Sequence, residues 1–207
     1  MNLFLKIFSK SFKVKEPKQN KSLNNLTDFL FEIAYLSKVK RSQVKNNNLT
    51  ISDHSYRVTM ISLILAERER KIDLSKLLIM ALIHDLPETR IGDLDLINKC
   101  YVDYQETKAL NDQLSNFSFK NKWLAIFNEL LEGKTKEAII VHEADILDEM
   151  LTDKNLLENG TKAASGWLDY FQNSLKTTYG KKIGKTIVNR NMNDWWQQIV
   201  LKKFKYK

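Results

Sequence analysis

The sequence predicts an all-α protein, a bundle of helices around one core, and three observations lead to this prediction. Its 207 residues include only two prolines and six glycines, so long stretches lack the residues that interrupt helices. Apolar residues recur at helical spacing in one segment after another, whereas strong runs of alternating β-branched residues, typical of strands, are absent. Apolar residues make up 43% of the chain, which is enough to bury a core.

Capping residues and apolar periodicity place the helices along the chain. Thr27, Ser52 and Asp73 stand at the starts of the first three, because short polar side chains cap helix N-termini. In chain order, the predicted helices span residues 27–38, 52–70, 73–86, 104–116, 120–132, 135–152, 161–178 and 185–203. The sixth is apolar nearly all round at its middle, which predicts a position at the centre of the bundle.

The chain divides into three predicted parts. Residues 1–22 mix leucine, isoleucine and phenylalanine with lysine and contain Pro17, which predicts a basic amphipathic extension that ends in a linker. Residues 23–155 form the core domain, and residues 156–207 form helices that pack on it. The extension lacks an apolar run long enough for a signal peptide or a membrane span. We expect it to dock on the domain or on a second subunit, with weak contact to a membrane surface as the alternative.

The formal net charge is +8, and much of it comes from lysines near the two ends of the chain. A basic surface attracts polyanions, but no RNA- or DNA-binding motif accompanies this charge, so we expect no long nucleic acid as a partner. The single cysteine, Cys100, excludes an intrachain disulfide and a cysteine-rich zinc site. A reducing compartment, the cytoplasm, is the expected location.

An acidic residue lies within the apolar central helix. Ala138 and Val141 flank Asp145 on one side of the helix, so its carboxylate is expected to point into the protein. A buried ionised carboxylate is costly unless it is paired or bound to a metal. A salt bridge to a neighbouring helix would explain Asp145 if it stood alone.

Two histidines and a second aspartate are expected close to Asp145. His54 begins the buried face of the second predicted helix, and His84 and Asp85 lie at the far end of the third. A short connection makes these helices antiparallel neighbours, so the start of one lies near the end of the other. Two imidazoles and two carboxylates suit one divalent transition metal, Mn, Fe, Co, Ni or Zn, with Mg as the harder alternative.

The segments "ISDHSYRV", "ALIHDLPETRIGDL" and "HEADILDEML" resemble the three signature segments of the HD-domain metal-dependent phosphohydrolases. The family's ordered pattern of H, HD and D is filled by His54, His84, Asp85 and Asp145. This resemblance covers roughly residues 26–152. It implies an HD-domain helical bundle in which the central helix carries the last metal ligand.

Within that family, the 5′-deoxynucleotidase-like branch is the most similar. Its members carry a Glu shortly after the HD pair and then a Gly-Asp, and these places are filled by Glu88, Gly92 and Asp93. We expect Glu88 to position or deprotonate the attacking water and Asp93 to protonate the leaving 5′ oxygen. Taken alone, Glu88 would be an ordinary helix-end carboxylate, and Asp93 would be an N-cap.

The same branch holds its substrate with an Arg, and an aromatic residue near it, in the loop before the first His. Arg41 stands in this loop beside Lys40, but the expected Trp is missing, which leaves the selectivity for deoxynucleosides open. Arg57, one turn after His54, is expected to face the phosphate or to pair with a carboxylate such as Asp53. A solvated loop charge is the alternative for Arg41.

Other polar and aromatic residues have simpler interpretations. His142 lies one turn before Asp145 and is expected to support the site from outside the ligand set or to be structural. Trp167, Phe171 and Trp195 belong to apolar patterns of helical spacing. We expect them to pack in the protein or to form the seam of a homodimer, rather than to stack on a base.

Together these inferences predict a metal-dependent phosphomonoesterase that hydrolyses nucleoside 5′-monophosphates, deoxynucleotides included, to nucleoside and phosphate. Two alternatives stay open. One is an HD hydrolase that cuts a nucleoside triphosphate, an alarmone or a cyclic nucleotide, and the other is a non-catalytic metal-binding regulator. Three histidines are few for a bimetallic cyclic-nucleotide enzyme, and a regulator has no need of Glu88 and Asp93.

Overall fold

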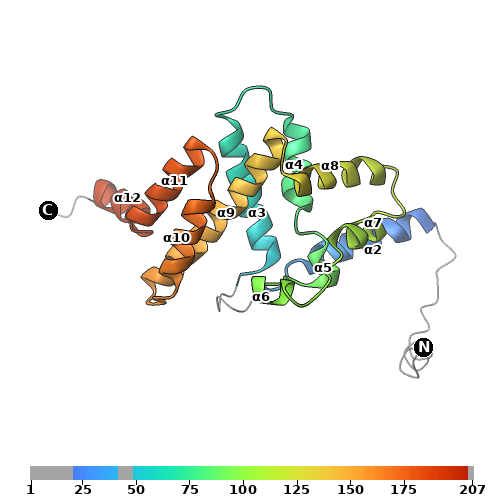
Figure 1. The fold of residues 1–207 in the computed structure, drawn as a ribbon, viewed down its shortest axis with the longest axis horizontal. Helices are drawn as coiled ribbons and strands as arrows, with labels where there is room; N and C mark the ends of the chain where they lie inside the picture. Colours follow the sequence, from blue (N-terminus) through green and yellow to red (C-terminus); the bar gives the residue numbers. More distant parts are fainter. Residues whose placement is uncertain (1–20, 42–48, 205–207) are drawn as a thin grey trace, which may run out of the picture.

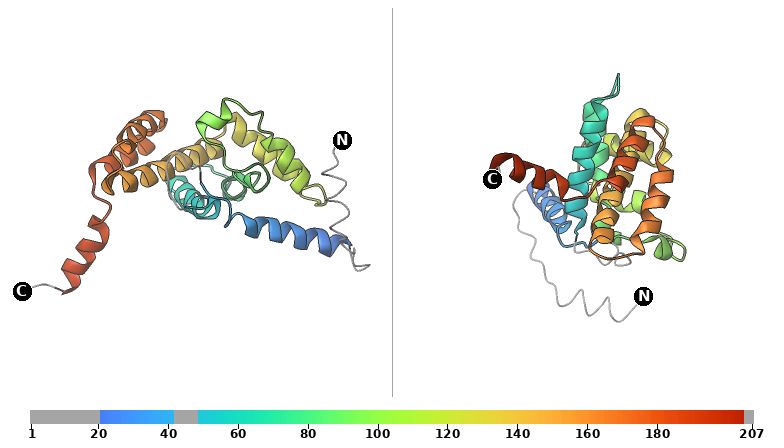
Figure 2. Two further views of the ribbon diagram at one scale, coloured as in Figure 1. Left: turned by 90° about the horizontal axis from the view of Figure 1, so that it is seen from below. Right: turned by 90° about the vertical axis from the view of Figure 1, so that its left-hand side faces the viewer.

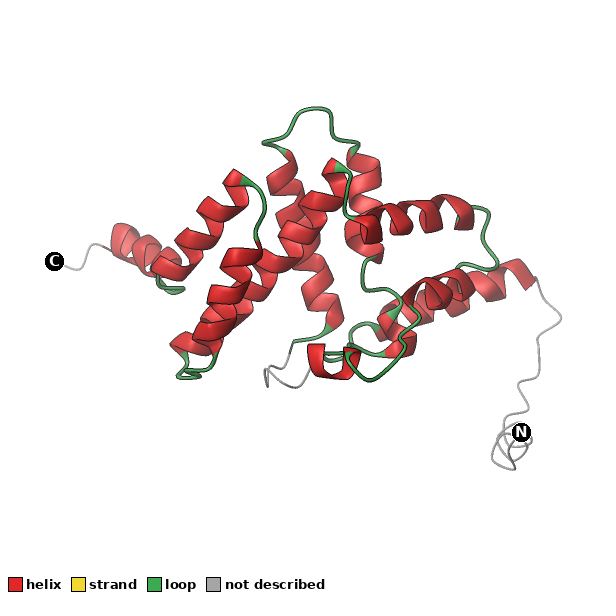
Figure 3. Cartoon of the chain, viewed as in Figure 1, coloured by secondary structure: helices red, strands yellow, loops and turns green. Residues whose placement is uncertain are grey.

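Helices form all the regular secondary structure in the part of the chain that the structure describes (Figure 3). The structure is a computed structural model that describes residues 21–41 and 49–204. Within these ranges there is no strand, and the one extended contact is an isolated antiparallel bridge between Lys40 and Thr50. The predicted all-α fold is therefore confirmed. Most of the predicted extension, including Pro17, lies outside the described residues.

Figure 1 shows the order of the helices along the chain. In chain order they are α2 Lys21–Tyr35, α3 Ile51–Ala66, α4 Leu74–Ile83, α5 Glu88–Ile91, α6 Leu96–Lys99, α7 Glu106–Gln113, α8 Lys120–Glu132, α9 Lys136–Glu158, α10 Ala164–Ser174, α11 Thr178–Asn189 and α12 Asp194–Phe204. No described helix is long and apolar enough to span a bilayer.

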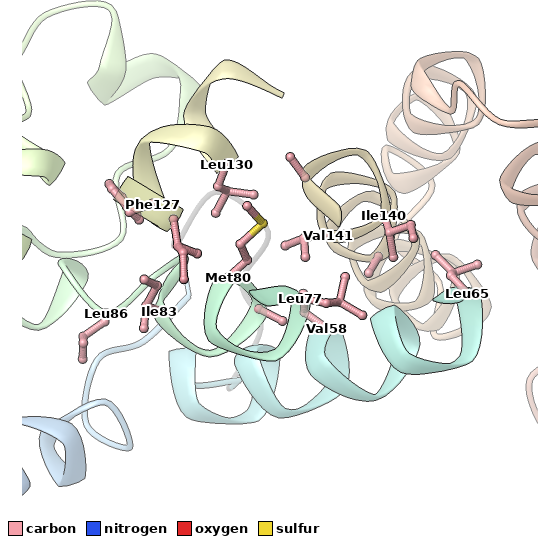
Figure 4. Close-up of a cluster of buried hydrophobic side chains, with 14 of the residues drawn as sticks. Val58, Leu65, Leu77, Met80, Ile83, Leu86, Phe127, Leu130, Ile140 and Val141 are labelled. Atoms are coloured by element: carbon pink, nitrogen blue, oxygen red, sulfur yellow. The ribbon is translucent and has the colours of Figure 1, made fainter. Parts of the chain in front are cut away.

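The long helix α9 is the centre of the fold, as its apolar middle predicts. It packs against α3, α4, α8, α10 and α11. Val58 of α3, Leu77 and Met80 of α4, Phe127 of α8 and Val141 of α9 meet in one buried cluster (Figure 4). Burial of such side chains stabilises each by about 1.5–3 kcal/mol relative to exposure, so this cluster fixes the mutual positions of the helices that carry the polar site.

Of the three predicted caps, only Asp73 is present. Asp73 accepts a hydrogen bond from the Lys76 amide at the start of α4. Helix α3 is capped by Thr50, two positions before the predicted Ser52, and Thr50 forms a reciprocal capping box with Asp53. Thr27 caps nothing, because α2 already begins at Lys21 and the Thr27 hydroxyl donates to a carbonyl of the preceding turn.

The helices after α9 are shorter than predicted. The single predicted helix 161–178 is wrong at its end, since α10 stops at Ser174 and α11 starts at Thr178. The break is fixed by Glu143 of α9, whose carboxylate accepts from the amides of Lys176 (2.8 Å) and Thr177 (2.5 Å). The predicted helix 185–203 is also divided, between α11 and α12.

Two short helices, α5 and α6, occupy a stretch for which no helix is predicted. α4 ends at Ile83, so His84 and Asp85 lie just beyond its last turn, where the following Pro87 disfavours a regular helix. The side chain of Asp95 accepts from the amides of Ile97 and Asn98, both at 2.8 Å, and caps α6. The N-cap of this segment is therefore Asp95 and not Asp93.

Candidate metal centre and substrate pocket

Four side chains from three parts of the chain gather around His54 Nε2. His54 Nε2 lies 3.2 Å from Asp145 Oδ1 and 3.3 Å from Asp85 Oδ2. His84 Nε2 lies 3.2 Å from Asp85 Oδ2 and also 3.2 Å from His54 Nε2. The four residues that the sequence singles out as candidate ligands therefore lie in two overlapping groups that share His54. His84 and Asp85 complete one group, and Asp145 and Glu149 complete the other.

The fold explains this convergence. His54 lies in the first turn of α3, and His84 and Asp85 follow the end of α4, so the packing of α3 against α4 brings them together. Asp145 lies at the middle of α9, which packs on both helices. Ile51 and Val58, on either side of His54, are fully buried and hold this turn of α3 in the core.

In both histidines the Nδ1 atom, which is not the atom of the proposed metal contact, has a hydrogen-bond partner of its own. His84 Nδ1 lies 2.8 Å from the Ala81 carbonyl oxygen, which can only accept, so Nδ1 carries the proton. His54 Nδ1 lies 2.7 Å from a carboxylate oxygen of Asp148. In the neutral rings both Nε2 atoms then present lone pairs, as metal-binding histidines do.

Asp148 is itself held by an arginine. Arg57 donates to both of its oxygens, at 2.5 Å from Nε and 2.9 Å from Nη2. Burial alone would raise the pKa of Asp148, but the hydrogen bonds from His54 and Arg57 keep that pKa below its usual range. The carboxylate therefore stays ionised and can orient the His54 ring.

The donor set fits a divalent cation. His54 Nε2 and His84 Nε2 lie only 3.2 Å apart, beside carboxylate oxygens, and in the neutral rings both would share electron pairs with a positive ion. Burial raises the pKa of Asp85, but the two neighbouring imidazoles outweigh burial and lower it well below the usual range. An ionised Asp85 and an ionised Asp145 would balance the charge of one divalent cation.

A pocket of about 280 Å³ opens beside this cluster. Asp85 and Asp145, two of the candidate metal ligands, line this pocket, and so do Glu88, Asp93 and Arg41. Glu88 is 7% exposed, and its Oε2 has no hydrogen-bond partner among the described residues. Burial first, and then repulsion by Asp85 and Asp93, raises the pKa of Glu88 to about 10.

Arg41 lies within the pocket wall. Its guanidinium contacts Asp85 (3.4 Å), Asp93 (3.8 Å) and Glu149. Burial would lower the pKa of Arg41, but the surrounding carboxylates raise it above its usual range. The alternative of a solvated loop charge does not describe this side chain, which is 16% exposed.

The structure does not bring Arg57 and Lys40 to the pocket. Arg57 is engaged by Asp148 and not by Asp53, which caps α3. The Lys40 side chain is exposed, and its charge helps to lower the pKa of Asp53, after the larger effect of hydrogen bonds from Thr50. Neither residue lines the cavity.

His142 has a structural role. Its Nε2 lies 2.8 Å from the Leu130 carbonyl oxygen at the end of α8. Its ring also lies 3.5 Å from the position that a Cβ would take at Gly133, where φ is +64°. Of the two interpretations given for His142, the structural one is correct, and the ring ties α9 to the α8 terminus.

Sequence reasoning missed several residues of the site. Asp148 and Glu149 lie three and four positions after Asp145, on the same face of α9, and this spacing could have identified them. The aromatic residues of α10 were harder to find. Trp167, Tyr170 and Phe171 line the pocket. Phe171 also packs against the hydrophobic core, as expected, whereas a subunit seam stays a prediction.

Comparison with known proteins now decides the family. A family model of the HD domain matches residues 33–187, which is most of the chain. The chain belongs to the HD domain family. This HD-domain protein is 28% identical over 144 residues to the 5′-deoxynucleotidase HDDC2 of Dictyostelium discoideum, covering 62% of this chain and 76% of that protein.

Solved structures share the fold of this HD-domain protein. A conserved hypothetical protein from Pyrococcus furiosus superposes with a TM-score of 0.66 at 27% identity, covering 79% of this chain and 99% of that chain. A predicted metal-dependent phosphohydrolase from Magnetospirillum magnetotacticum has a TM-score of 0.62 at 19% identity and covers 84% of this chain and 94% of that chain. The match to the HD domain and the cluster of histidine and aspartate side chains together identify the chain as an HD-domain metal-dependent phosphohydrolase.

Proposed function

We propose that the HD-domain protein hydrolyses nucleoside 5′-monophosphates, deoxynucleotides among them, to nucleoside and phosphate. The observation that carries the proposal is one pocket in which the His/Asp donor set adjoins Glu88, Asp93 and Arg41. The similarity to a 5′-deoxynucleotidase supports the same substrate class. Phosphate monoesters hydrolyse extremely slowly without help, and this pocket offers the groups that the reaction needs.

His54, His84, Asp85 and Asp145 are the proposed ligands of one divalent cation, with Mn, Co, Fe, Ni or Zn favoured over Mg by the two nitrogen donors. Such a cation would neutralise charge on a phosphoryl oxygen and make a water molecule more acidic.

Glu88 is the proposed acceptor of the proton from the attacking water. Its carboxylate is buried at the pocket wall, and one oxygen is available for this contact among the described residues. The raised pKa of Glu88 arises from burial and from the charges of Asp85 and Asp93. Compensation of the Asp85 charge by a cation would relieve part of that repulsion and favour the basic form of Glu88.

Arg41 and Asp93 are the proposed partners of the phosphate and of the leaving group. Three carboxylates hold the Arg41 guanidinium at the pocket wall, where its donors can bind phosphate oxygens in place of Asp93 or Glu149. Asp93, in its protonated form, would donate a proton to the 5′ oxygen while the bond from that oxygen to phosphorus breaks, and the proton that Glu88 takes from the attacking water would restore it. Water supplies the new oxygen on phosphorus, so the products are a nucleoside and inorganic phosphate.

Phosphate release from a panel of compounds tests this function. The panel contains nucleoside 5′-monophosphates, a nucleoside triphosphate, an alarmone and a cyclic nucleotide, each assayed with Mn²⁺ or Co²⁺ and with excess chelator. We expect chelator-sensitive release from the monophosphates. Turnover of only the triphosphate, the alarmone or the cyclic nucleotide would select another HD hydrolase, and no turnover at all would favour the regulator.

Four further predictions concern features of the protein other than the pocket. A homodimer and a cytoplasmic location stay predictions, as do the division into residues 1–22, 23–155 and 156–207 and weak membrane contact by the extension.

A further inference from the structure

The pocket wall contains two chemically different sets of residues. One set comprises the carboxylates and Arg41, which suit a cation and a phosphate. The other set is apolar and aromatic, with Trp167, Tyr170 and Phe171 on α10 and Leu96 and Ile97 on α6, where Asp95 and Lys99 also line the wall. A phosphate group alone gains little from the second set, because aromatic walls contribute little to the binding of a hydrated anion.

The rings of α10 reach the pocket because α10 packs along α9 (Figure 1). Leu168 supplies the core contact of α10 and is almost fully buried. Trp167, its neighbour, lies outside the hydrophobic core and at the pocket wall. The pocket face of α9, with Asp145 and Glu149, forms the adjoining wall.

The rings support one another, so the aromatic wall is already formed. The Trp167 and Phe171 rings are inclined by only 30°, with centroids 6.3 Å apart. Tyr170 stands nearly perpendicular to both, at 87° to Trp167 and 73° to Phe171. Such offset and edge-on packing holds aromatic rings in place.

We infer that this wall is the nucleobase subsite of the pocket and that Trp167 is its stacking residue. The inference rests on the proposed function for the phosphate end of the substrate. Every base has a π-face, so a stacking ring binds purines and pyrimidines alike. The wall therefore selects monophosphates that carry a base over sugar phosphates without one, with little preference among bases.

Equilibrium binding to the Mn²⁺-loaded full-length protein tests the inference without turnover. The ligands are non-hydrolysable 5′-phosphonate analogues of deoxyadenosine and thymidine, and the matched deoxyribose phosphonate without a base, each measured by titration calorimetry. The wild type should bind both base-bearing analogues more tightly than the base-free one. Trp167→Ala should weaken the two base-bearing analogues by about tenfold, within the range for loss of a stacking ring, and leave the base-free analogue unchanged.

Three further variants make the test specific. Trp167→Phe keeps an aromatic face and should retain most of the preference for a base, whereas Trp167→Leu keeps an apolar side chain and should lose it. Trp195→Ala, on α12, removes a tryptophan outside this pocket and should change nothing. If Trp167→Ala does not fold, the comparison of Trp167→Phe with Trp167→Leu still shows whether the preference for a base needs an aromatic ring at this position.

Some outcomes overturn the inference. These are equal affinity of the wild type for base-bearing and base-free analogues, no binding of either, or an equal change in both on substitution of Trp167. The proposed function fails separately. Trp167-dependent binding of nucleotide analogues without phosphate release from any monophosphate would support the subsite and refute the phosphatase.

Discussion

At the scale of single residues, the site depends on groups that never touch the proposed cation. Asp148 accepts from His54 Nδ1 and from Arg57, and the Ala81 carbonyl accepts from His84 Nδ1. These contacts fix which ring nitrogen carries the proton and therefore which nitrogen can bind a metal.

The Asp148→Asn substitution should weaken the affinity for Mn²⁺ by about 10- to 100-fold, the usual cost of losing such a supporting contact. The amide is neutral, so it holds the His54 ring and the Arg57 guanidinium less strongly. Competition with a chelator of known affinity measures the effect, and Asp169→Asn, on an exposed residue of α10, is the control. Unchanged affinity would remove Asp148 from the site.

Substitution of Glu88 by Gln should leave metal content intact and lower kcat by about 10² to 10⁴, the range for loss of a positioned base. Burial, Asp85 and Asp93 raise the pKa of Glu88 to about 10, so the neutral amide resembles the protonated side chain and should not destabilise the fold. Metal analysis, the melting temperature and phosphate release are measured on the same preparation. Near-normal turnover would exclude Glu88 from the reaction.

The residues of the candidate site were predictable from the sequence only where they share a motif. His54, His84, Asp85 and Asp145 stand in short segments whose spacing and helical context imply convergence. Trp167 lies more than twenty residues beyond the last of them, in a helix whose orientation is set by packing on α9. Only the tertiary structure could place its ring beside the pocket.

At the scale of helices, the clearest difference from expectation is the break between α10 and α11. A periodic pattern continues through residues 161–178, but the buried Glu143 of α9 binds the amides at Lys176 and Thr177 and interrupts it. Helix existence was predictable from local periodicity, whereas this boundary depends on a carboxylate more than thirty residues away.

Gly180→Ala should destabilise the protein by about 1–3 kcal/mol, as overpacking does. A Cβ at this position would lie 2.6 Å from Glu143 Oε2, and Glu143 is buried and held by its own hydrogen bonds. Gly166→Ala, on α10, is the matched control, since no atom lies within 4 Å of its added Cβ and alanine favours the helix. The free energy of unfolding of both variants is measured by urea denaturation. If Gly180→Ala is as stable as Gly166→Ala, Glu143 can move aside and the prediction is contradicted.

At the scale of the whole molecule, α2 and α12 project from opposite ends of the body (Figure 2). Both expose large apolar side chains, among them Leu30 and Phe31 on α2 and Trp195 and Ile199 on α12. α2 is attached to the body chiefly through Phe29, which packs on Phe117, and through a polar network centred on Glu32.

The attachment of α2 should respond to acid. Burial raises the pKa of Glu32, but hydrogen bonds from Arg90, Gln113 and Thr89 lower it overall below the reference value of 4.5. A folded-state pKa below the unfolded one adds stability above about pH 4.5, and this contribution disappears as the pH falls through the folded-state value. The Glu32→Gln variant should therefore be less stable than the wild type at pH 7 and approach it as the pH falls through the folded-state pKa of Glu32. A difference that does not depend on pH would contradict this assignment.

The central claim is that one divalent cation, held by His54, His84, Asp85 and Asp145, makes the protein a nucleoside 5′-monophosphatase. Titration of Mn²⁺ into metal-free protein, with phosphate release from a deoxynucleoside 5′-monophosphate as the readout, tests it most directly. We predict that activity rises linearly and levels off at one ion per chain, and that Asp145→Ala shows no such rise. Activity that needs no metal, or an Asp145→Ala variant with wild-type stoichiometry and turnover, would contradict the account.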